Sequence, residues 1–219
     1  MIKNIIFDFD GVLVDSEILV ARSLSRYLAD RNIKFEEKQF SKFAGKKTIK
    51  IISELSSLFN IEDKQLFFND IISLAKNLYA NKLQAVSGVA NFLKKTNHSR
   101  LIGSNNIKDR IIDGLKKIEL NNYFAENSIF SFDLVGKPKP EPDIYLRAVK
   151  DWGINKEETI IIEDSVIGIQ AGVASGIKVV GLTAGGHWYK DRSNQELYDA
   201  GAYEVVNNYA DMLLLINKL

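Results

Sequence analysis

The chain of 219 residues contains no cysteine and only two histidines, His98 and His187. The missing cysteine excludes disulfides, thiolate zinc sites, iron–sulfur clusters and thiol nucleophiles. A catalytic zinc site with three histidine ligands is excluded as well, and at most two imidazoles are available for a Ser-His-Asp arrangement. Any chemistry therefore falls to carboxylates, lysine, serine and a metal ion bound through oxygen.

An excess of charge of one sign and long apolar runs are also lacking. The 29 basic and 28 acidic residues give a net charge of +1, which argues against a nucleic-acid surface. No run approaches the ~18 apolar residues that span a bilayer. The apolar residues before Asp8 are too few for a signal sequence, so we expect no targeting segment. With 46% hydrophobic and 26% charged residues, we expect a globular, cytoplasmic monomer with no membrane or nucleic-acid partner.

Apolar segments alternate with helical patterns over most of the chain. The segment 4–9 is apolar on both faces, which is typical of a buried parallel strand. Further strands are predicted at 100–104, 128–131, 159–162, 178–181 and 204–206. Because helical patterns separate these strands, the sequence predicts βαβ units and a parallel sheet.

A purely helical stretch interrupts this alternation after the first strand. Helices are predicted at 16–31, 36–44, 47–59 and 62–80. We interpret residues 16–85 as an inserted helical domain, which leaves 1–15 and 86–219 as the core. The insert carries 12 basic and 8 acidic residues, and the core 17 basic and 20 acidic. This difference fits a basic cover over an anionic substrate, and it fits equally well a chance distribution on solvated faces.

Polar residues follow several of the predicted strands. They are Asp8, Asp10, Ser104, Lys137, Glu163 and Asp164. Taken singly, each has an ordinary explanation as a turn, cap or solvated loop residue. Together they lie where open α/β sheets bind ligands, beyond the carboxyl ends of the strands. Clustered carboxylates call for a hard cation such as Mg²⁺, and a hydroxyl and an ammonium beside it are the parts needed for phosphoryl transfer.

Four segments carry a resemblance to a known family. The run FDFDGVLVDSE at 7–17 resembles the first motif of the haloacid dehalogenase-like hydrolases. SNN at 104–106, GKPKPEPDIYL at 136–146 and IIIEDSVIGIQAGVASG at 160–176 resemble the other three motifs, in the same order. The resemblance is strongest to the beta-phosphoglucomutase-like group, especially its phosphatases for small sugar phosphates. It implies a Rossmann-like parallel sheet with helices on both faces and an inserted, all-helical cap domain.

The resemblance also implies roles for the four carboxylates. Asp8 is the nucleophile that takes the phosphoryl group. Asp10 protonates the leaving oxygen and later activates water. Mg²⁺ is held by the Asp8 side chain, the Asp10 backbone carbonyl and Asp164, with Glu163 in a direct or supporting role.

The remaining site residues are implied to contact the substrate. Ser104 and Lys137 hold the phosphoryl group, Lys137 offsets the charge of the nucleophile, and Asn105 adds a contact. Lys46 and Lys47, in a loop of the insert, are expected to touch the anionic substrate. Two solvated lysines after a turn glycine would explain these last two residues equally well.

Alternative functions differ at identifiable positions. Dehalogenases of this family lack the second aspartate, and Asp10 is present. Mutases of the beta-phosphoglucomutase type carry a histidine where this chain has Val20, and an arginine in the loop that here holds lysines. We therefore expect hydrolysis of a small phosphorylated metabolite through an aspartyl-phosphate, with a sugar phosphate mutase as the alternative.

Two classes of protein without this activity share some of these features. Receiver domains place their acidic pair after the first strand and their nucleophile on a later one, which fits neither the Asp8 and Asp10 spacing nor the insert. A non-catalytic protein that binds a phosphorylated metabolite is the other alternative. The loop containing His187, Trp188 and Tyr189 is either a rim contact to the substrate or the cap, or a surface loop whose aromatics pack on the core.

Overall fold

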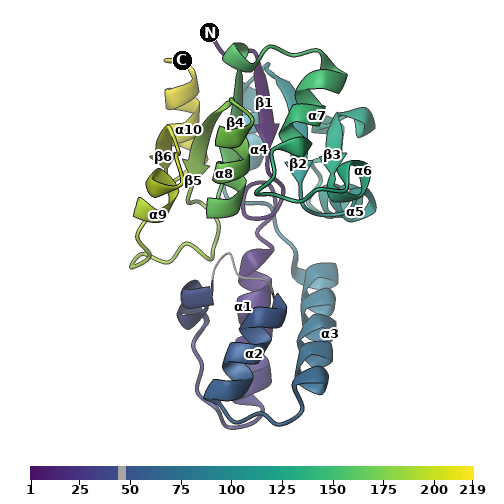
Figure 1. The fold of residues 1–219 in the computed structure, drawn as a ribbon, viewed down its shortest axis with the longest axis vertical. Helices are drawn as coiled ribbons and strands as arrows, with labels where there is room; N and C mark the ends of the chain where they lie inside the picture. Colours follow the sequence, from purple (N-terminus) through teal and green to yellow (C-terminus); the bar gives the residue numbers. More distant parts are fainter. Residues whose placement is uncertain (44–47) are drawn as a thin grey trace. The chain divides into compact units, whose positions relative to one another are not determined.

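The computed structural model describes residues 1–43 and 48–219. These residues form a six-stranded sheet in which every neighbouring pair is parallel, in the order β3-β2-β1-β4-β5-β6 (Figure 1). The strands are β1 (Asn4–Phe7), β2 (Ser99–Ser104), β3 (Ile129–Ser131), β4 (Thr159–Glu163), β5 (Lys178–Leu182) and β6 (Glu204–Val206). The predicted parallel α/β sheet is confirmed.

Strand β1 lies in the middle of the sheet and is fully buried. Ile5, Ile6 and Phe7 have no exposed surface, which explains why the sequence is apolar on both faces here. Phe7 is in register with Ile102 of β2 on one side and Ile162 of β4 on the other. The three strands therefore end at the same edge, and the polar residues that follow them are brought together there.

Helices cover both faces of this sheet. They are α4 (Val89–Lys95), α5 (Lys108–Lys117), α6 (Phe132–Val135), α7 (Asp143–Trp152), α8 (Val166–Ala174), α9 (Gln195–Asp199) and α10 (Tyr209–Ile216). Helices α7 and α8 lie over one face and α4 over the other (Figure 1). Phe92 of α4 packs edge-on against Phe7 of β1 and also against Tyr209 of α10. These aromatic contacts attach α4 and α10 to the central strand.

Short helical turns complete the core, and some details differ from the sequence prediction. The turns are η2 (Asn121–Tyr123), η3 (Glu126–Ser128) and η4 (Lys156–Glu158). Gly88 is the N-cap residue of helix α4, and its positive φ of 87° favours glycine. Helices α6 and α9 were not predicted, since each is only one turn long. None of the helices in the described residues has the length and apolar character needed to span a bilayer.

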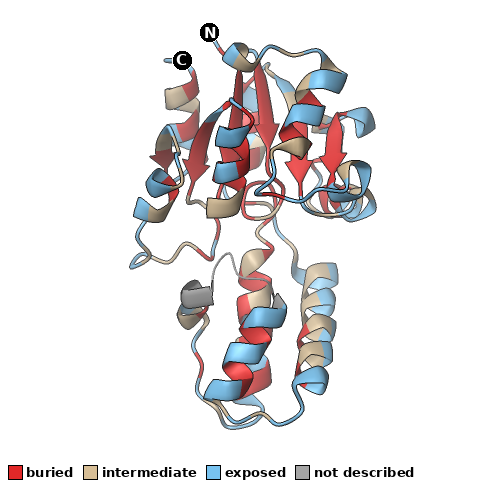
Figure 2. Ribbon diagram, in the orientation of Figure 1, coloured by how far each residue is buried: buried red, intermediate tan, exposed pale blue. Residues whose placement is uncertain are grey.

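The stretch between β1 and α4 is helical in its described residues. It contains α1 (Glu17–Ala29), the 3₁₀ helix η1 (Glu37–Phe43), α2 (Thr48–Leu58) and α3 (Lys64–Lys82). The Asp63 side chain caps α3 by accepting a hydrogen bond from the Leu66 amide at 2.8 Å. Tyr27 of α1 stacks on Phe67 of α3, with 4.7 Å between the ring centroids. The buried apolar residues of these helices form one cluster, and Figure 2 colours buried residues red.

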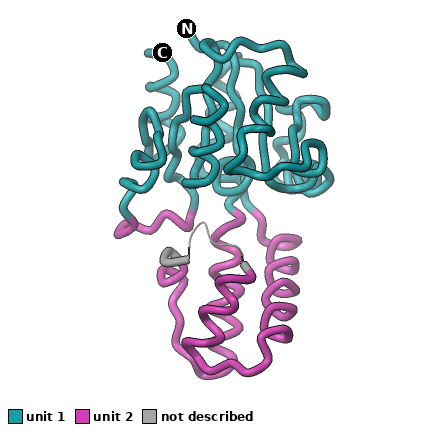
Figure 3. Tube along the Cα trace, in the orientation of Figure 1, with its two compact units in different colours: residues 1–15, 84–185, 193–219 teal, residues 16–83, 186–192 magenta. Residues whose placement is uncertain are grey.

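Backbone contacts divide the chain into two compact units (Figure 3). We call them the core unit (Met1–Asp15, Gln84–Gly185 and Ser193–Leu219) and the helical unit (Ser16–Leu83 and Gly186–Arg192). The first segment of the helical unit therefore ends two residues before the end of the expected insert of residues 16–85. Gln84 accepts a hydrogen bond from the Asp15 amide at 2.9 Å, and Ala85 forms an antiparallel bridge with Val14. These contacts hold both connecting segments in the core unit.

The segment 186–192 groups with the helical unit, although the sequence placed it in the core. Tyr189 packs against the apolar cluster of the helical unit. His187 is buried, and the Arg192 guanidinium lies 3.6 Å from the centroid of the Trp188 ring. The sequence predicted that the aromatic residues of this loop would pack on the core, whereas Tyr189 packs on the helical unit.

Candidate active site

Asp8 follows β1 directly and is held at the end of the strand. Its amide donates to the Ile162 carbonyl of β4 at 2.9 Å, which continues the sheet pattern by one residue. Gly11 then adopts a positive φ of 74°, and the amides of Leu13 and Val14 both donate to the Phe9 carbonyl. This tight turn keeps Asp8 buried at the edge of the sheet, with the loop that carries Asp10 folded back beside it.

Glu163, the last residue of β4, is completely buried and receives five hydrogen bonds. Its Oε1 accepts from Lys139 Nζ at 2.6 Å and from the Tyr145 hydroxyl at 2.8 Å. Its Oε2 accepts from the Asp164 amide at 3.1 Å, the Ser165 amide at 3.3 Å and the Ser165 hydroxyl at 3.1 Å. Because both oxygens are occupied, this geometry favours the supporting role for Glu163 over direct metal ligation.

The ammonium beside Asp8 belongs to Lys139, and the prediction that it belongs to Lys137 is corrected. The Lys139 side chain is 3% exposed, and its Nζ lies 2.5 Å from Asp8 Oδ1 and 2.6 Å from Glu163 Oε1. The Lys137 side chain is 64% exposed and pairs with Asp143 at 3.0 Å. Both lysines precede a proline in the same loop, so the local sequence does not distinguish them.

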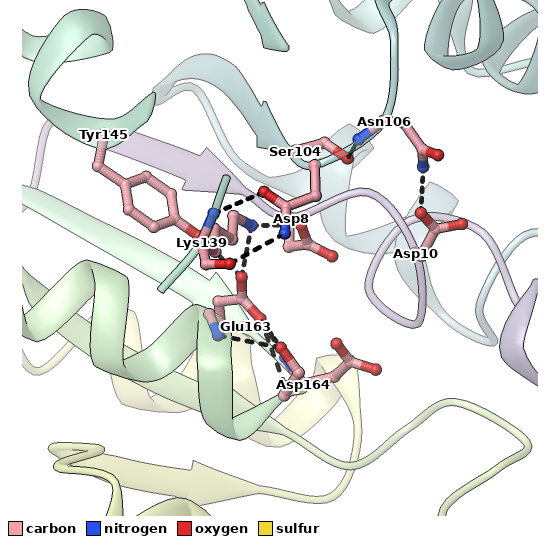
Figure 4. Close-up of polar contacts among 11 residues, drawn as sticks. Asp8, Asp10, Ser104, Asn106, Lys139, Tyr145, Glu163 and Asp164 are labelled. Carbon is pink, nitrogen blue, oxygen red and sulfur yellow. Dashed lines mark hydrogen bonds and ion pairs between the residues drawn. The ribbon is translucent and has the colours of Figure 1, made fainter. Parts of the chain in front are cut away.

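The SNN motif at the end of β2 supports two other site residues. The Ser104 hydroxyl is buried and accepts from the Asn106 amide at 3.1 Å. Asn105 binds the backbone of Lys139, since its Oδ1 accepts from the Lys139 amide at 2.7 Å and its Nδ2 donates to the Lys139 carbonyl at 3.4 Å. Asn106, which the sequence did not single out, donates from its side chain to the Asp10 carboxylate (Figure 4). The Asn105 side chain, which was expected to contact the substrate, thus binds the backbone of Lys139.

Burial and charge govern the ionisation of the central pair. Burial raises the pKa of Asp8 well above its usual value, the neighbouring Glu163, Asp164 and Asp10 charges raise it further, and Lys139 lowers it. Burial alone would lower the pKa of Lys139, but the Asp8 and Glu163 carboxylates outweigh it and hold this pKa well above its usual value. Lys139 therefore stays a cation, and one more positive charge would favour the ionised form of Asp8.

The buried carboxylates fit a hard divalent cation. Asp8, Glu163 and Asp164 each offer an oxygen within 4.8 Å of the others, and all three are buried. The ammonium of Lys139 offsets only one of these three negative charges, and an uncompensated buried charge is costly. An all-oxygen donor set of carboxylates suits Mg²⁺ or Ca²⁺ rather than a metal that prefers nitrogen or sulfur. Lys46 and Lys47, expected to contact the substrate, lie outside the described residues.

Comparison with known proteins places this arrangement in a family. The sequence profile described as haloacid dehalogenase-like hydrolase matches residues 5–182. The chain belongs to the haloacid dehalogenase-like hydrolases, as its four motifs predicted. It is also 27% identical over 192 residues, 85% of each chain, to a 6-phosphogluconate phosphatase of Escherichia coli (strain K12).

Two solved structures share the whole fold. A conserved haloacid dehalogenase-like protein of Agrobacterium tumefaciens superposes with a TM-score of 0.91 at 31% identity, covering 100% of this chain and 99% of the other. A hydrolase of the same family from Deinococcus radiodurans, solved with bound phosphate and sodium, gives a TM-score of 0.86 at 27% identity. The coverage there is 99% of this chain and 96% of the other. The predicted fold class and the hydrolase class of the enzyme are confirmed.

Proposed function

We propose that the protein is a Mg²⁺-dependent phosphatase that hydrolyses a small phosphorylated metabolite, a sugar phosphate or a similar compound, through an aspartyl-phosphate on Asp8. The observation that carries this proposal is the buried ion pair of Asp8 with Lys139, fixed by Glu163 at the ends of β1 and β4. The name of the Escherichia coli relative and the phosphate bound by the Deinococcus radiodurans hydrolase support a phosphorylated substrate. The cytoplasmic location and the monomeric state stay predictions.

The first step is the binding of the phosphoryl group at the strand ends. An ammonium has three donors, of which Asp8 and Glu163 use two, and we expect the third donor of Lys139 to bind a phosphoryl oxygen. The buried Ser104 hydroxyl at the end of β2 offers a further hydrogen bond. Both groups are held before substrate arrives, so little reorganisation is needed when negative charge develops in the transition state.

The chemistry then runs in two steps. A carboxylate oxygen of Asp8 forms a bond to phosphorus while the bond from phosphorus to the leaving oxygen breaks, and Asp10 gives its proton to that oxygen. Water next attacks the same phosphorus, Asp10 takes the proton from the water, and the bond to Asp8 breaks to release phosphate. Asn106 holds the Asp10 carboxylate at one oxygen. The two aspartates therefore have separate tasks because they have separate partners.

The metal would be held by the carboxylates of Asp8 and Asp164 and the backbone carbonyl of Asp10. When bound, Mg²⁺ supplies positive charge that stabilises the phosphoryl oxygens and the ionised nucleophile. Glu163, already saturated by five donors, keeps Lys139 and the Asp164 backbone in place. The raised pKa of Asp8 without a cation is the reason to expect strict metal dependence.

A panel of phosphorylated metabolites tests the proposal directly. It includes 6-phosphogluconate, several sugar phosphates and p-nitrophenyl phosphate, with released phosphate as the readout. We expect release with Mg²⁺, none with EDTA, and poor replacement by Ca²⁺, which prefers more ligands at longer distances. Turnover that persists in EDTA would contradict the metal site, and absence of release from every compound would contradict the phosphatase.

A further inference from the structure

Gly168, in the first turn of α8, lies against the Glu163 carboxylate, which accepts five hydrogen bonds. A Cβ atom built on Gly168 would be 1.8 Å from Glu163 Oε1, 1.9 Å from Cδ and 2.1 Å from Oε2. No side chain fits at such distances, so the carboxylate occupies the volume that any other residue would fill. The Gly168 amide donates to the Ser165 hydroxyl at 3.1 Å, and that hydroxyl in turn donates to Glu163.

The Glu163 carboxylate has no low-cost way to move aside. Its two oxygens accept five hydrogen bonds, including those from Lys139 and the buried Tyr145 hydroxyl. The Tyr145 ring packs closely on the backbone of Gly103 in β2: a Cβ atom built on Gly103 would lie 2.9 Å from Cε1 of the ring. A displaced carboxylate would lose these bonds, and Lys139 would lose one of the two anions that direct it.

We propose that Gly168 is a positioning residue for the reaction. Its missing side chain leaves the space that the Glu163 carboxylate occupies, which we call the seat, and this carboxylate in turn directs the Lys139 ammonium toward Asp8. This inference rests on the proposed function, since it concerns the ammonium that neutralises the nucleophile. Glycine inside a helix is less favourable than alanine, so a glycine here calls for a specific reason. The close approach of the carboxylate is that reason.

A second glycine on the same helix provides a matched control. A Cβ on Gly172, one turn further along α8, would lie 2.5 Å from Val179 Cγ2 and 3.0 Å from Ile161 Cδ1. Alanine at Gly172 therefore also strains the packing of α8 on the sheet, but against apolar side chains of β4 and β5 instead of the Glu163 carboxylate. Gly168→Ala and Gly172→Ala add the same methyl group to the same helix and differ in what that group displaces.

The test compares kcat and KM for p-nitrophenyl phosphate at saturating Mg²⁺, corrected for the folded fraction. We expect kcat to fall about 100-fold in Gly168→Ala, because a misplacement of about 1 Å has an effect of this size. KM should change less than about threefold, since the ammonium acts on charge that develops in the transition state. Gly172→Ala should keep the wild-type kcat. Equal kcat in the two variants would overturn the proposal.

Tyr145→Phe covers the case in which Gly168→Ala folds poorly, and a double variant tests whether Gly168 and Glu163 act through the same carboxylate. Tyr145→Phe adds no volume and removes only one donor to Glu163, and we expect it to lower kcat about tenfold with little change in KM. Glu163→Gln combined with Gly168→Ala should give an effect smaller than the product of the two single effects, because both act through the same carboxylate. Independent, multiplying effects would contradict the seat.

A crystal structure of Gly168→Ala separates this inference from the proposed function. If wild type and Gly172→Ala release no phosphate from any compound, the phosphatase fails, and the inferred seat is then decided by the coordinates alone. A Glu163 carboxylate displaced from Lys139 in the variant supports the seat. A carboxylate that keeps its bonds to Lys139 and Tyr145 refutes it.

Discussion

The two units of the chain bury different kinds of side chain. In the described part of the helical unit, the buried residues are apolar apart from His187 and a few serines, and Ser23 and Ser56 each donate to the carbonyl four residues earlier in their own helix. In the core unit, Asp8 and Glu163 are among four buried residues with an acidic or basic side chain. The helical unit therefore buries mainly apolar side chains that pack together, whereas the core unit also buries acidic and basic side chains that interact electrostatically.

The ion pairs of the two units differ in the same way. Arg22 and Glu37 in the helical unit are joined at 3.4 Å with about half of each side chain exposed, and such pairs contribute roughly 0–1 kcal/mol. The pairs that Lys139 forms in the core unit are almost completely buried. Removing one partner of a buried pair leaves an uncompensated charge, which costs about 3–5 kcal/mol. The buried ion pairs of the core unit therefore lie where we propose that the chemistry takes place.

Replacing the nucleophile should produce the largest effect. In Asp8→Asn the side chain keeps its size but can no longer form the bond to phosphorus, so we expect loss of turnover well beyond the ~10²–10⁴ of an acid–base residue. Phosphate release and circular dichroism melting of the purified variant check this. Near-normal turnover in a folded Asp8→Asn protein would remove the assignment.

Lys139 and Lys137 offer a matched pair within one loop. Lys139→Met should lower kcat by roughly 10²–10³, the size of effect seen when one electrostatic contact to the transition state is removed, and should also lower the melting temperature. Lys137→Met should leave both unchanged, since its exposed pair with Asp143 is a surface contact. If Lys137→Met proves the more damaging change, the assignment based on burial is wrong.

A cavity in the helical unit should affect stability without touching the chemistry. Phe67 is fully buried against Tyr27, and Phe67→Ala should lower the free energy of unfolding by about 3–5 kcal/mol. Urea denaturation measures this loss, and kcat for p-nitrophenyl phosphate per folded molecule should stay at the wild-type value. A kcat that falls as strongly as in Lys139→Met would contradict the claim that the helical unit contributes to stability and not to the chemistry.

The smallest expected effect is the pH dependence at His98 in the core unit. Burial lowers the pKa of His98 below its usual 6.5, and the Arg100 charge lowers it further. As the pH falls, His98 binds a proton in the unfolded chain before it does so in the folded chain. The contribution of neutral His98 to the free energy of unfolding is therefore intact above pH 6.5 and is lost below it. Wild type should lose slightly more stability than His98→Asn between neutral pH and the acid side of this value. Equal losses in urea titrations would show that His98 contributes nothing.

The sequence predicts the sheet and the acidic cluster because both follow from short-range patterns. A strand that is apolar on both faces can only be central, and the carboxylates at its end must then meet those of its neighbours. Asp8 and Glu163 could be placed in this way without coordinates. The same patterns located every strand of the described sheet.

Contacts that depend on the path of a loop could not be predicted. Lys137-Pro138 and Lys139-Pro140 are the same dipeptide, and the hydrogen bonds of Asn105 to the Lys139 backbone appear only in the fold. In the sequence Gly168 is an ordinary glycine of a helical pattern. Only the fold shows that the Glu163 carboxylate occupies the space that a side chain at Gly168 would fill. The segment 186–192 carries no pattern that indicates the unit against which it packs.

The covalent intermediate is the most direct test of the central claim, that buried Asp8 is the group that takes the phosphoryl. Protein turning over p-nitrophenyl phosphate or the best metabolite is quenched with acid, and the acyl phosphate is reduced with borohydride, which converts a phosphorylated aspartate to homoserine. Peptide mass spectrometry then locates the modified residue. The account predicts homoserine at position 8 in wild type and none in Asp8→Asn. Homoserine at Asp10 or Asp164, or rapid turnover with no modified aspartate, would contradict it.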